Sequence, residues 1–383
     1  MKITKVTATP LNVPLRIALL GLERATTLSV CLVEVETDGG VTGHGLTGIT
    51  EEDVIAQIIH GVAGPAILGD DPLANEHVWD KLYWTLMPRG QTGYAAHALA
   101  AIDVALWDIK GKALNQPIWR LLGGARPRVP VYATFGFGFF DRAQLAAAAK
   151  LWVSQGFTRL KMTVGHEGLR RRDARGLLEL IREDEARIRT VREAVGPDIE
   201  LFIDANCSLD LYHAARLCEM IRPYGISFFE EPITQNDPLL MAQLRRQTGM
   251  RLACGQNEGL MYRFRDLLLN ESVDYVQPNV VITGGFSQCI KIAGLAAAFN
   301  VPIANGGAWP FHNMHLQAGV ANGTLVEHHY LAVELCRQIY DDLPSPQGGC
   351  LALPEAPGLG FEINRAAVRE LAKLPSSGGR GKG

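Results

Sequence analysis

The sequence has no strong excess of charge of either sign, and its basic residues are not clustered. Its 383 residues include 37 Lys and Arg against 40 Asp and Glu, which gives a formal net charge of -3. A nearly neutral protein without a basic patch has no electrostatic field that would hold a polyanion or an anionic lipid surface. We therefore expect no nucleic acid and no membrane among its partners.

Long apolar runs and paired cysteines are also missing. No apolar segment approaches the length of a membrane-spanning helix, and residues 1–5 do not begin a secretory leader. The seven cysteines lie apart, without a Cys-x-x-Cys pair, as is typical of reduced and buried thiols. These absences favour a cytoplasmic protein without a zinc site.

The sequence does contain enough apolar residues for a large core. Hydrophobic residues make up 47% of the chain, and its length suits one barrel with a smaller domain. In the first third, the residue pattern predicts strands over 3–13 and 29–37, a turn at 38–40, loops over 15–27 and 43–48, and a helix over 94–113. Together these predict an α+β unit over residues 1–125, in which the two loops would set specificity.

The rest of the chain repeats a pattern of strand, loop and helix. Apolar runs predict eight strands, at 129–134, 158–162, 200–204, 226–230, 251–255, 274–277, 301–304 and 324–327. Amphipathic segments such as 143–155 and 238–248 lie between them, and the charged segment 170–195 is typical of solvated outer helices without a binding role. Eight strands are what a closed parallel barrel needs. The last residues, 376–383, have the composition of a disordered tail.

Three of the predicted strands end in an oxygen-bearing side chain. Asp204, Glu230 and Gln256 each follow an apolar run, and two equal intervals of 26 residues separate them. In a closed parallel barrel such strand ends meet at the C-terminal face, where their oxygens could hold a hard cation. An acidic residue after a strand can also cap the next helix, but three polar residues at equal spacing favour the cation site.

Several motifs resemble one known family. They are AIDVALWDIKGK at residues 101–112, Asp204-Ala205-Asn206, Glu230-Glu231-Pro232, and PGLGFEI at 357–363. With them, nearly the whole chain resembles the mandelate racemase and muconate lactonizing enzyme group of the enolase superfamily. The resemblance implies an α/β fold with a modified (β/α)8 TIM-type barrel over 126–345, under an N-terminal α+β capping domain that a C-terminal segment, 346–375, completes. It also implies magnesium as cofactor and a homo-oligomer.

The resemblance implies that Asp204 and Glu230 bind the magnesium ion. Removing a proton next to a carboxylate creates an enediolate dianion, which needs a strong positive charge at its oxygens. Carboxylate oxygens are hard ligands that suit this ion. The family commonly has a third Glu where this chain has Gln256, so we expect a neutral amide ligand and weaker binding. Glu258 is the alternative third ligand.

A second difference from the family concerns the base. The family places Lys-x-Lys at the end of the second barrel strand, and the matching residues here are Lys161, Met162 and Thr163. Threonine cannot abstract a proton near neutral pH. Lys161 is then either the base itself or the group that polarises the substrate carboxylate, and Thr163 is expected to bind substrate.

A third difference is the absence of the Asp and His dyad that many relatives carry. Asn279 stands at the first of the two matching places, and Gly306 or Gly307 at the second. We expect Asn279 to bind substrate instead, together with Asn206 and Trp309.

Two residues near the end of the barrel are candidates for catalysis. His312, expected in a loop before a helix, could act as acid or base because the pKa of histidine lies close to neutral, although a lone loop histidine can also be structural. Glu327 matches an electrophilic carboxylic acid of the family, which could share a proton with the substrate carboxylate. His328 and His329 could instead simply pair with Glu327.

The sequence thus predicts an enzyme that binds magnesium and a small-molecule carboxylate. The leading reaction is that of a lyase, the dehydration of a sugar acid by loss of its α-proton and β-hydroxyl, because dehydration is the commonest activity that the resemblance implies. The alternatives are a racemase or epimerase, a cycloisomerase, and a carboxylate-binding protein that has lost catalysis. The three differences from the family motivate the last of these.

Overall fold

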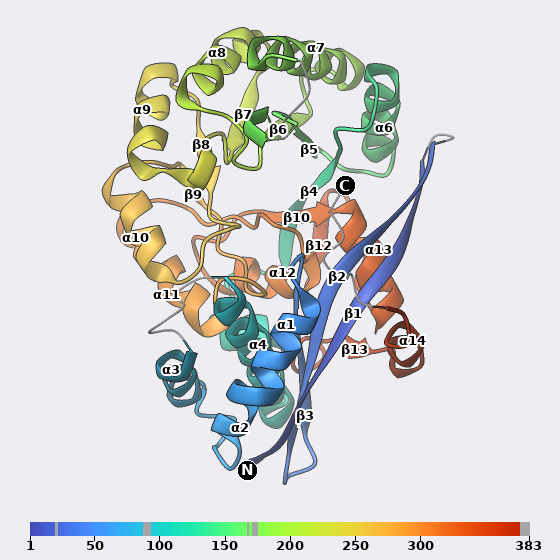
Figure 1. Cartoon of the computed structure of the whole chain (residues 1–383), viewed down its shortest axis with the longest axis vertical. Coiled ribbons are helices and arrows are strands. Elements are labelled where there is room, and N and C mark those ends of the chain that lie inside the picture. The colour runs from blue at the N-terminus through green and yellow to red at the C-terminus, as the bar shows by residue number, and fades with distance from the viewer. Residues whose placement is uncertain (20–21, 87–92, 167, 171–174, 376–383) are drawn as a thin grey trace.

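An antiparallel sheet with its helices and a parallel barrel make up the fold (Figure 1). The computed structural model describes residues 1–19, 22–86, 93–166, 168–170 and 175–375. The tail predicted over 376–383 lies outside the described residues. Among the helices that are described, none combines the length and the apolar character that a membrane crossing requires.

The N-terminal sheet has three antiparallel strands in sequence order. They are β1 (Ile3–Leu19), β2 (Leu22–Thr37) and β3 (Thr42–Gly48). Every second residue of β1 from Leu11 to Ile17 is buried, which is the period expected of a strand with one face on a core. The pairing continues outward to Arg16 opposite Ala25, so the two long strands form one extended hairpin.

The loops predicted over 15–27 and 43–48 are therefore wrong, apart from residues 20 and 21, which lie outside the described part. In the hairpin, charged residues such as Arg16 and Glu23 occupy the exposed face. The alternation of apolar and polar residues that marks a strand is therefore hard to recognise in the sequence. The glycines of β3 have a packing role, because a Cβ at Gly45 would lie 2.0 Å from the carbonyl oxygen of Ala101. They let the strand approach the backbone of the helix that covers it.

The cap helices pack on this sheet and also reach the barrel. They are α1 (Glu52–Ile58), α2 (Gly64–Ile67), α3 (Asn75–Leu86) and α4 (Tyr94–Leu114), the last of which matches the helix predicted at 94–113. On the barrel side, Asp103 of α4 accepts hydrogen bonds from the hydroxyl and the backbone N–H of Ser287, at 2.6 and 3.0 Å. Burial raises the pKa of Asp103 to about 7, although Ser287 opposes the shift.

In the described residues, seven parallel strands form most of the barrel wall. In sheet order they are β10 (Val326–His329), β4 (Arg128–Gly136), β5 (Arg159–Thr163), β6 (Glu200–Asp204), β7 (Ile226–Glu230), β8 (Leu252–Cys254) and β9 (Tyr275–Val276). The strand predicted at 301–304 is reduced to Ile303, which bridges Val276 on one side and Gly323 on the other. Pro302 beside it has no N–H to donate to a ladder.

The inside of the barrel has an aromatic layer. The rings of Phe202 and Phe228 stack with their centroids 4.1 Å apart, and Tyr132 meets Phe202 edge-on at 5.3 Å. Because side chains two positions apart in a strand share a face, these residues direct Asp204 and Glu230 to the same interior, one layer closer to the strand ends.

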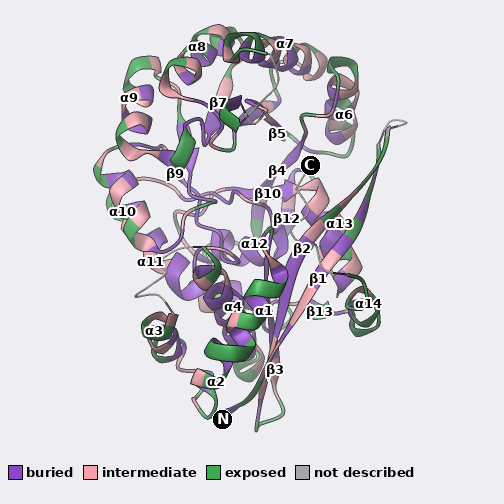
Figure 2. Ribbon diagram, viewed as in Figure 1, coloured by how far each residue is buried: buried purple, intermediate pink, exposed green. Residues whose placement is uncertain are grey.

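Most of the outer helices expose one face and bury the other, as Figure 2 shows, whereas every residue of Pro310–Gly319 is buried. They are α6 (Arg142–Ser154), α7 (Leu177–Val195), α8 (Leu211–Ile221), α9 (Pro238–Thr248), α10 (Met261–Leu269), α11 (Gly285–Ala298), α12 (Pro310–Gly319) and α13 (Tyr330–Ile339). A short helix, α5 (Ile118–Leu121), joins the cap to the barrel. The segment predicted to be solvated is only partly so, since Asp184 and Arg187 of α7 are buried.

The C-terminal segment returns to the cap. First, β12 (Cys350–Ala352) pairs with β4 and β13 (Glu362–Ile363) pairs with β11 (Tyr340–Asp341), both antiparallel. Helix α14 (Arg365–Leu371) then places the guanidinium of Arg365 2.7 Å from Glu34 on β2. This ion pair places the C-terminal segment against the cap sheet.

Candidate active site

One buried lysine lies among three carboxylates at the C-terminal ends of the barrel strands. The ammonium nitrogen of Lys161, on β5, is 2.7 Å from Oε2 of Glu230 and 3.4 Å from Oδ2 of Asp204. It is also 2.9 Å from Oε1 of Glu327. All four side chains are almost completely buried. We call these four residues the Lys161 cluster.

Strand register brings the Lys161 cluster together. Thr163 of β5 lies opposite Asp204 of β6, and Asp204 lies opposite Glu230 of β7. Lys161 shares a strand face with Thr163 and so points toward the same interior. The equal sequence intervals therefore reflect strand ends that meet at one level of the barrel.

The charges within the Lys161 cluster do not balance. Burial alone would lower the pKa of Lys161, but the neighbouring carboxylates outweigh it and raise that pKa well above its usual value. Burial and the nearby Asp204 raise the pKa of Glu230 well above its usual value, although Lys161 opposes this shift. One ammonium thus faces three acidic groups in a dry site, and a divalent cation would offset the remaining repulsion.

Gln256, in the loop after β8, lies beside the Lys161 cluster. Its Nε2 donates to Oε2 of Glu231 at 2.9 Å and lies 3.4 Å from Oδ2 of Asp204. Glu231 also accepts hydrogen bonds from Asn236 and Asn257, at 2.8 and 2.7 Å. The amide therefore presents its nitrogen to Asp204, and it must turn over to offer its oxygen to a cation.

Glu258, the alternative third ligand, has partners of its own. It accepts a hydrogen bond from Nε of Arg263 at 3.1 Å and one from Asn236 at 3.2 Å. Burial raises the pKa of Glu258, although Arg263 opposes the shift. Glu258 would have to give up both partners to reach a cation, so Gln256 is the better placed of the two.

The surroundings of Asp204 and Glu230 fit a hard divalent cation. Oε1 of Glu230 is buried and, within the described chain, accepts no hydrogen bond. Gly306 leaves space beside it, because a Cβ there would lie 2.9 Å from this oxygen. A free carboxylate oxygen next to a second carboxylate is a donor set that suits magnesium. The described residues contain no group of three or more His, Cys, Asp or Glu side chains placed to hold a metal ion, so Gln256 is the candidate for a third protein ligand.

Glu327, at the end of β10, is held by hydrogen bonds on both oxygens. Oε1 accepts from the hydroxyl of Thr134 and Oε2 accepts from the backbone N–H of Ala308, each at 2.6 Å. Burial opposes ionisation, but Lys161 outweighs it with the help of these donors and lowers the pKa of Glu327 to about 2. The neutral carboxylic acid that the sequence predicted is therefore not the form favoured here, where Glu327 is a carboxylate.

The two histidines after Glu327 point to opposite sides of β10. His329 shares the inner side with Glu327, and its ring centroid lies 5.4 Å from that of Phe137. Burial lowers the pKa of His329, although Glu327 opposes the shift, so the ring is neutral at neutral pH. His328 faces outward and packs against Trp152 and Phe157, at centroid distances of 6.0 and 5.2 Å.

The buried His328 is expected to make the fold sensitive to acid. Burial lowers its pKa to about 3, and neither ring nitrogen has a hydrogen-bond partner among the described residues. The stability that depends on neutral His328 is therefore complete above the unfolded pKa of about 6.5 and is lost as the pH falls toward 3. The full shift corresponds to a free energy on the order of 5 kcal/mol.

We expect His328→Leu to flatten the pH dependence of the unfolding free energy between about pH 6 and pH 4. Urea denaturation at a series of pH values measures this slope. His77→Leu is the matched control, because His77 is exposed. Equal slopes for His328→Leu and the unmodified protein would contradict the prediction.

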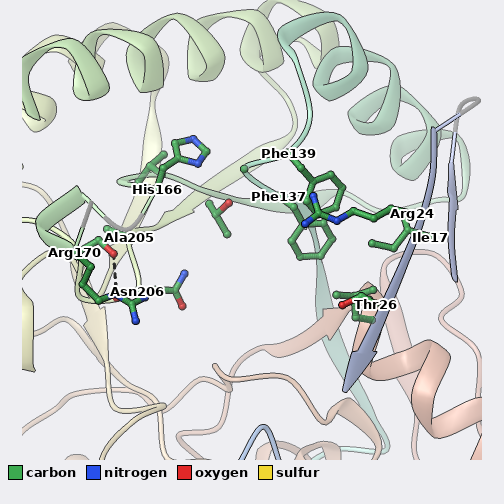
Figure 3. A pocket seen from close by; sticks show the side chains of 14 residues that line it. Ile17, Arg24, Thr26, Phe137, Phe139, His166, Arg170, Ala205 and Asn206 are labelled. Atoms are coloured by element: carbon green, nitrogen blue, oxygen red, sulfur yellow. Dashed lines mark hydrogen bonds between the residues drawn. The ribbon is translucent and has the colours of Figure 1, made fainter. Parts of the chain in front are cut away.

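A cavity of about 610 Å³, whose lining residues Figure 3 shows, lies at the ends of the strands that carry Lys161 and Asp204. The hairpin of β1 and β2, the loop after β4, and the ends of β5 and β6 line it. Thr163 and Asn206, two of the predicted substrate-binding residues, both face it. The backbone N–H of Asn206 donates to Oδ1 of Asp204 at 2.8 Å, which ties this wall to the cluster.

The other two predicted substrate-binding residues do not line this cavity. Asn279 is fully buried, where its amide donates to the carbonyl of Gly306 at 2.8 Å and accepts from the backbone N–H of Val281 at 3.2 Å. Trp309 is also fully buried, with its ring so close to Gly48 of β3 that a Cβ there would lie 2.4 Å from it. Their roles in substrate binding stay predictions, and the contacts seen are structural.

His312 lies inside α12, so its predicted position in a loop is wrong. Its ring is fully buried, with centroids 5.3 Å from Phe361 and 5.7 Å from Tyr340, both close to the cap. Burial lowers the pKa of His312 well below its usual value. Because the ring packs against Phe361 and Tyr340 rather than against a residue that lines the cavity, we do not assign proton transfer to His312.

Sequence reasoning missed several residues of the cavity wall. Phe137 and Phe139 follow β4 in the run Gly136-Phe137-Gly138-Phe139, and such a glycine and aromatic run after a barrel strand could have marked them. Arg170 comes from the segment predicted to pack outside without a binding role, yet it lines the cavity. The periodicity of apolar residues could not indicate the role of Arg170, because this residue lies in a short turn between β5 and α7.

Comparison with known proteins identifies the family. Residues 144–367 match the family described as enolase C-terminal domain-like, and residues 2–123 match the N-terminal domain of mandelate racemase / muconate lactonizing enzyme. The chain therefore belongs to the mandelate racemase and muconate lactonizing enzyme group of the enolase superfamily. The predictions of the fold class and of an enzyme are confirmed.

Similar proteins include dehydratases and cycloisomerases. The chain is 29% identical to arabinonate dehydratase of Saccharolobus solfataricus, over 90% of both chains. It is 32% identical to D-galactarolactone cycloisomerase of Agrobacterium fabrum, over 88% of this chain and 90% of that one. The crystal structure of L-talarate dehydratase from Polaromonas sp. JS666, complexed with Mg and L-glucarate, matches with a TM-score of 0.83 at 28% identity, over 95% of this chain and 96% of that one.

Proposed function

We propose that this chain is a magnesium-dependent lyase that dehydrates a sugar acid. The observation that carries the proposal is the Lys161 cluster, in which one ammonium and three carboxylates meet beside a cavity under the cap. Membership of the family supports the reaction type. The activities named for similar proteins, and the magnesium and L-glucarate bound by one of them, support the cofactor and a carboxylate substrate.

Asp204, Glu230 and Gln256 are the residues that would hold magnesium. The ion, when bound, supplies positive charge that stabilises the negative charge developing on the substrate carboxylate as the α-carbon loses its proton. Asp204 and Glu230 are fixed by their strands, and Oε1 of Glu230 has no competing donor. Gln256 adds an oxygen without a charge, so we expect weaker binding than at a site with three carboxylates.

The chain's own side chains then have separate roles. Lys161 is held as a cation by the carboxylates around it, so it binds and polarises the substrate carboxylate. Glu327 is a carboxylate that fixes the position of Lys161. His329 is neutral and partly exposed, and it contacts Phe137 of the cavity wall, which makes it the best placed acceptor for the α-proton.

In this reaction two bonds of the substrate break. The α-carbon loses a proton to His329, and the electron pair left behind expels the β-hydroxyl, which departs as water after taking up a proton. The resulting enol takes a proton at its β-carbon and becomes a 2-oxo-3-deoxy acid. No oxidant or reductant is needed.

Deuterium exchange tests the proposal. The protein, with Mg²⁺ in deuterated water, is incubated with a panel of aldonates and aldarates, and proton NMR follows the α-proton and the 2-oxo-3-deoxy product. We expect both changes for at least one acid sugar, and a loss of about 100-fold or more in His329→Gln. His77→Gln, an exposed histidine, is the control. Reaction of no acid sugar would overturn the function, and full activity of His329→Gln would overturn only the assigned proton acceptor.

Cycloisomerisation is the second candidate, because a similar protein is a D-galactarolactone cycloisomerase. The same cavity would then hold a lactone, and ring opening would follow loss of the α-proton. Adding aldarolactones to the panel separates the two reactions, since cycloisomerisation conserves the atoms of the substrate whereas dehydration releases water.

A further inference from the structure

The described residues that line the cavity include two arginines. Arg24 comes from β2 of the cap, and Arg170 comes from the turn after β5. No Asp or Glu is among the described residues that line the cavity. This contrasts with the chain as a whole, whose formal net charge is -3. Two cationic side chains around a space of about 610 Å³ favour an anionic occupant.

Arg24 is positioned by an aromatic ring rather than by a carboxylate. The carbon at the centre of its guanidinium lies 4.7 Å from the centroid of the Phe139 ring. Within the described part of the chain, no hydrogen bond or ion pair engages this side chain. Contact with a ring face orients a guanidinium, and the N–H groups in the plane of the guanidinium remain available. Arg24 is therefore held in place while its donors stay open.

The other arginine of the same hairpin behaves differently. Arg16, on β1, is exposed and forms an ion pair with Glu23 at 2.6 Å. It is not among the residues that line the cavity. The two arginines thus have the same chemistry and nearly the same place in the fold, but only Arg24 faces the cavity.

Arg24 lies across the cavity from the reaction centre. In Figure 3 it extends from the hairpin over Phe139, whereas Asn206 and Arg170 stand on the opposite side. Asn206 and Thr163 are the wall residues next to Asp204 and Lys161. A substrate with its reacting carboxylate at the Lys161 cluster would therefore direct its far end toward Arg24.

We propose that Arg24 binds a second anionic group at the far end of the substrate. This inference rests on the proposed function and narrows its substrate class to sugar acids with two anionic ends, such as an aldarate with two carboxylates. A terminal phosphate offers the same chemistry to the guanidinium fork, so a phosphorylated aldonate is the other member of this class.

Matched substrates test the inference. The kinetic parameters kcat and KM are measured for an aldonate, for the aldarate of the same configuration, and for the aldonate phosphorylated at its terminal carbon. We expect a higher kcat/KM for one of the two doubly anionic acids than for the plain aldonate, and which of them is preferred identifies the distal group. A plain aldonate that is used as well as both of them would overturn the inference.

Variants of Arg24 provide the second arm of the test. Arg24→Gln should raise KM for the doubly anionic substrate by about 10- to 100-fold with little change in kcat, and should leave the plain aldonate unaffected. Arg24→Lys should recover part of the loss, and Arg16→Gln is the matched control. Thermal unfolding checks that each variant is folded. An equal effect of Arg24→Gln on all three substrates would contradict the inference, whereas failure of every acid sugar to exchange its α-proton would reject the proposed function instead.

Discussion

Lys161→Met is expected to lower the rate of α-proton exchange by about 100- to 1000-fold, the effect of removing one charged group from a dry reaction centre. The ammonium of Lys161 lies within 2.9 Å of both Glu230 and Glu327, and no other described lysine contacts these carboxylates. Methionine keeps most of the length of the side chain and removes its charge and its N–H donors. Proton NMR in deuterated water with Mg²⁺, on the best acid sugar of the panel, measures the change.

The same variant separates the role of Lys161 in folding from its role in catalysis. Without the ammonium, three buried carboxylates repel one another, and we expect the metal-free variant to lose about 3–5 kcal/mol of unfolding free energy. Mg²⁺ should then stabilise Lys161→Met more than it stabilises the unmodified protein. Lys150→Met, on the exposed face of α6, is the control. Undiminished exchange in Lys161→Met would show that the substrate carboxylate is polarised by another group.

Glu230→Gln is expected to weaken Mg²⁺ binding by about 100-fold or more and to abolish exchange. The substitution keeps the shape of the side chain but removes one of the two charges that we assign to the metal. It also places an amide nitrogen where Oε1 of Glu230 now lies without a partner. Isothermal titration calorimetry with Mg²⁺ measures the affinity. Retained affinity would refute the assignment of Glu230 as a ligand.

Gln256→Glu should change Mg²⁺ affinity in the opposite direction, by about 10-fold, because it adds a third carboxylate to the site. The new charge would face Glu231 and Asp204, which the amide of Gln256 now contacts at 2.9 and 3.4 Å. The metal-free variant should therefore unfold at a lower temperature, and Mg²⁺ should reverse the loss. Unchanged affinity would indicate that position 256 does not reach the metal.

The strand ends of the candidate site could be predicted because a parallel barrel repeats one geometry. Asp204 and Glu230 follow apolar runs at equal spacing, and any such residue at the end of a barrel strand reaches the same face. The adjacent register of β6 and β7 confirms that these two side chains meet. The side chain of Lys161 was placed by the same logic, as a lysine on an otherwise apolar strand.

Other features of the fold and the site depend on contacts between residues that are far apart in the sequence, and no local sequence pattern indicates these contacts. The alternation of buried and exposed residues in β1 and β2 is not evident from the sequence, because Arg16 and Glu23 pair on the outer face of the hairpin. His312 was expected in a loop before the helix, and the sequence alone does not show that α12 begins at Pro310 and is buried throughout. The direction of the Gln256 amide depends on Glu231, which accepts its N–H group. Glu231 also accepts hydrogen bonds from Asn236 and Asn257, and the sequence does not show that these residues meet.

The junction between α4 and α11 limits how a ligand can enter. Asp103 holds Ser287 through two hydrogen bonds, and the indole of Trp107 donates to the same serine hydroxyl at 2.9 Å. A rotation of the entire N-terminal layer away from the barrel would break these three buried hydrogen bonds. A ligand is therefore expected to reach the cavity without such a rotation, and the wall residues that β2 contributes keep their place relative to the strand ends.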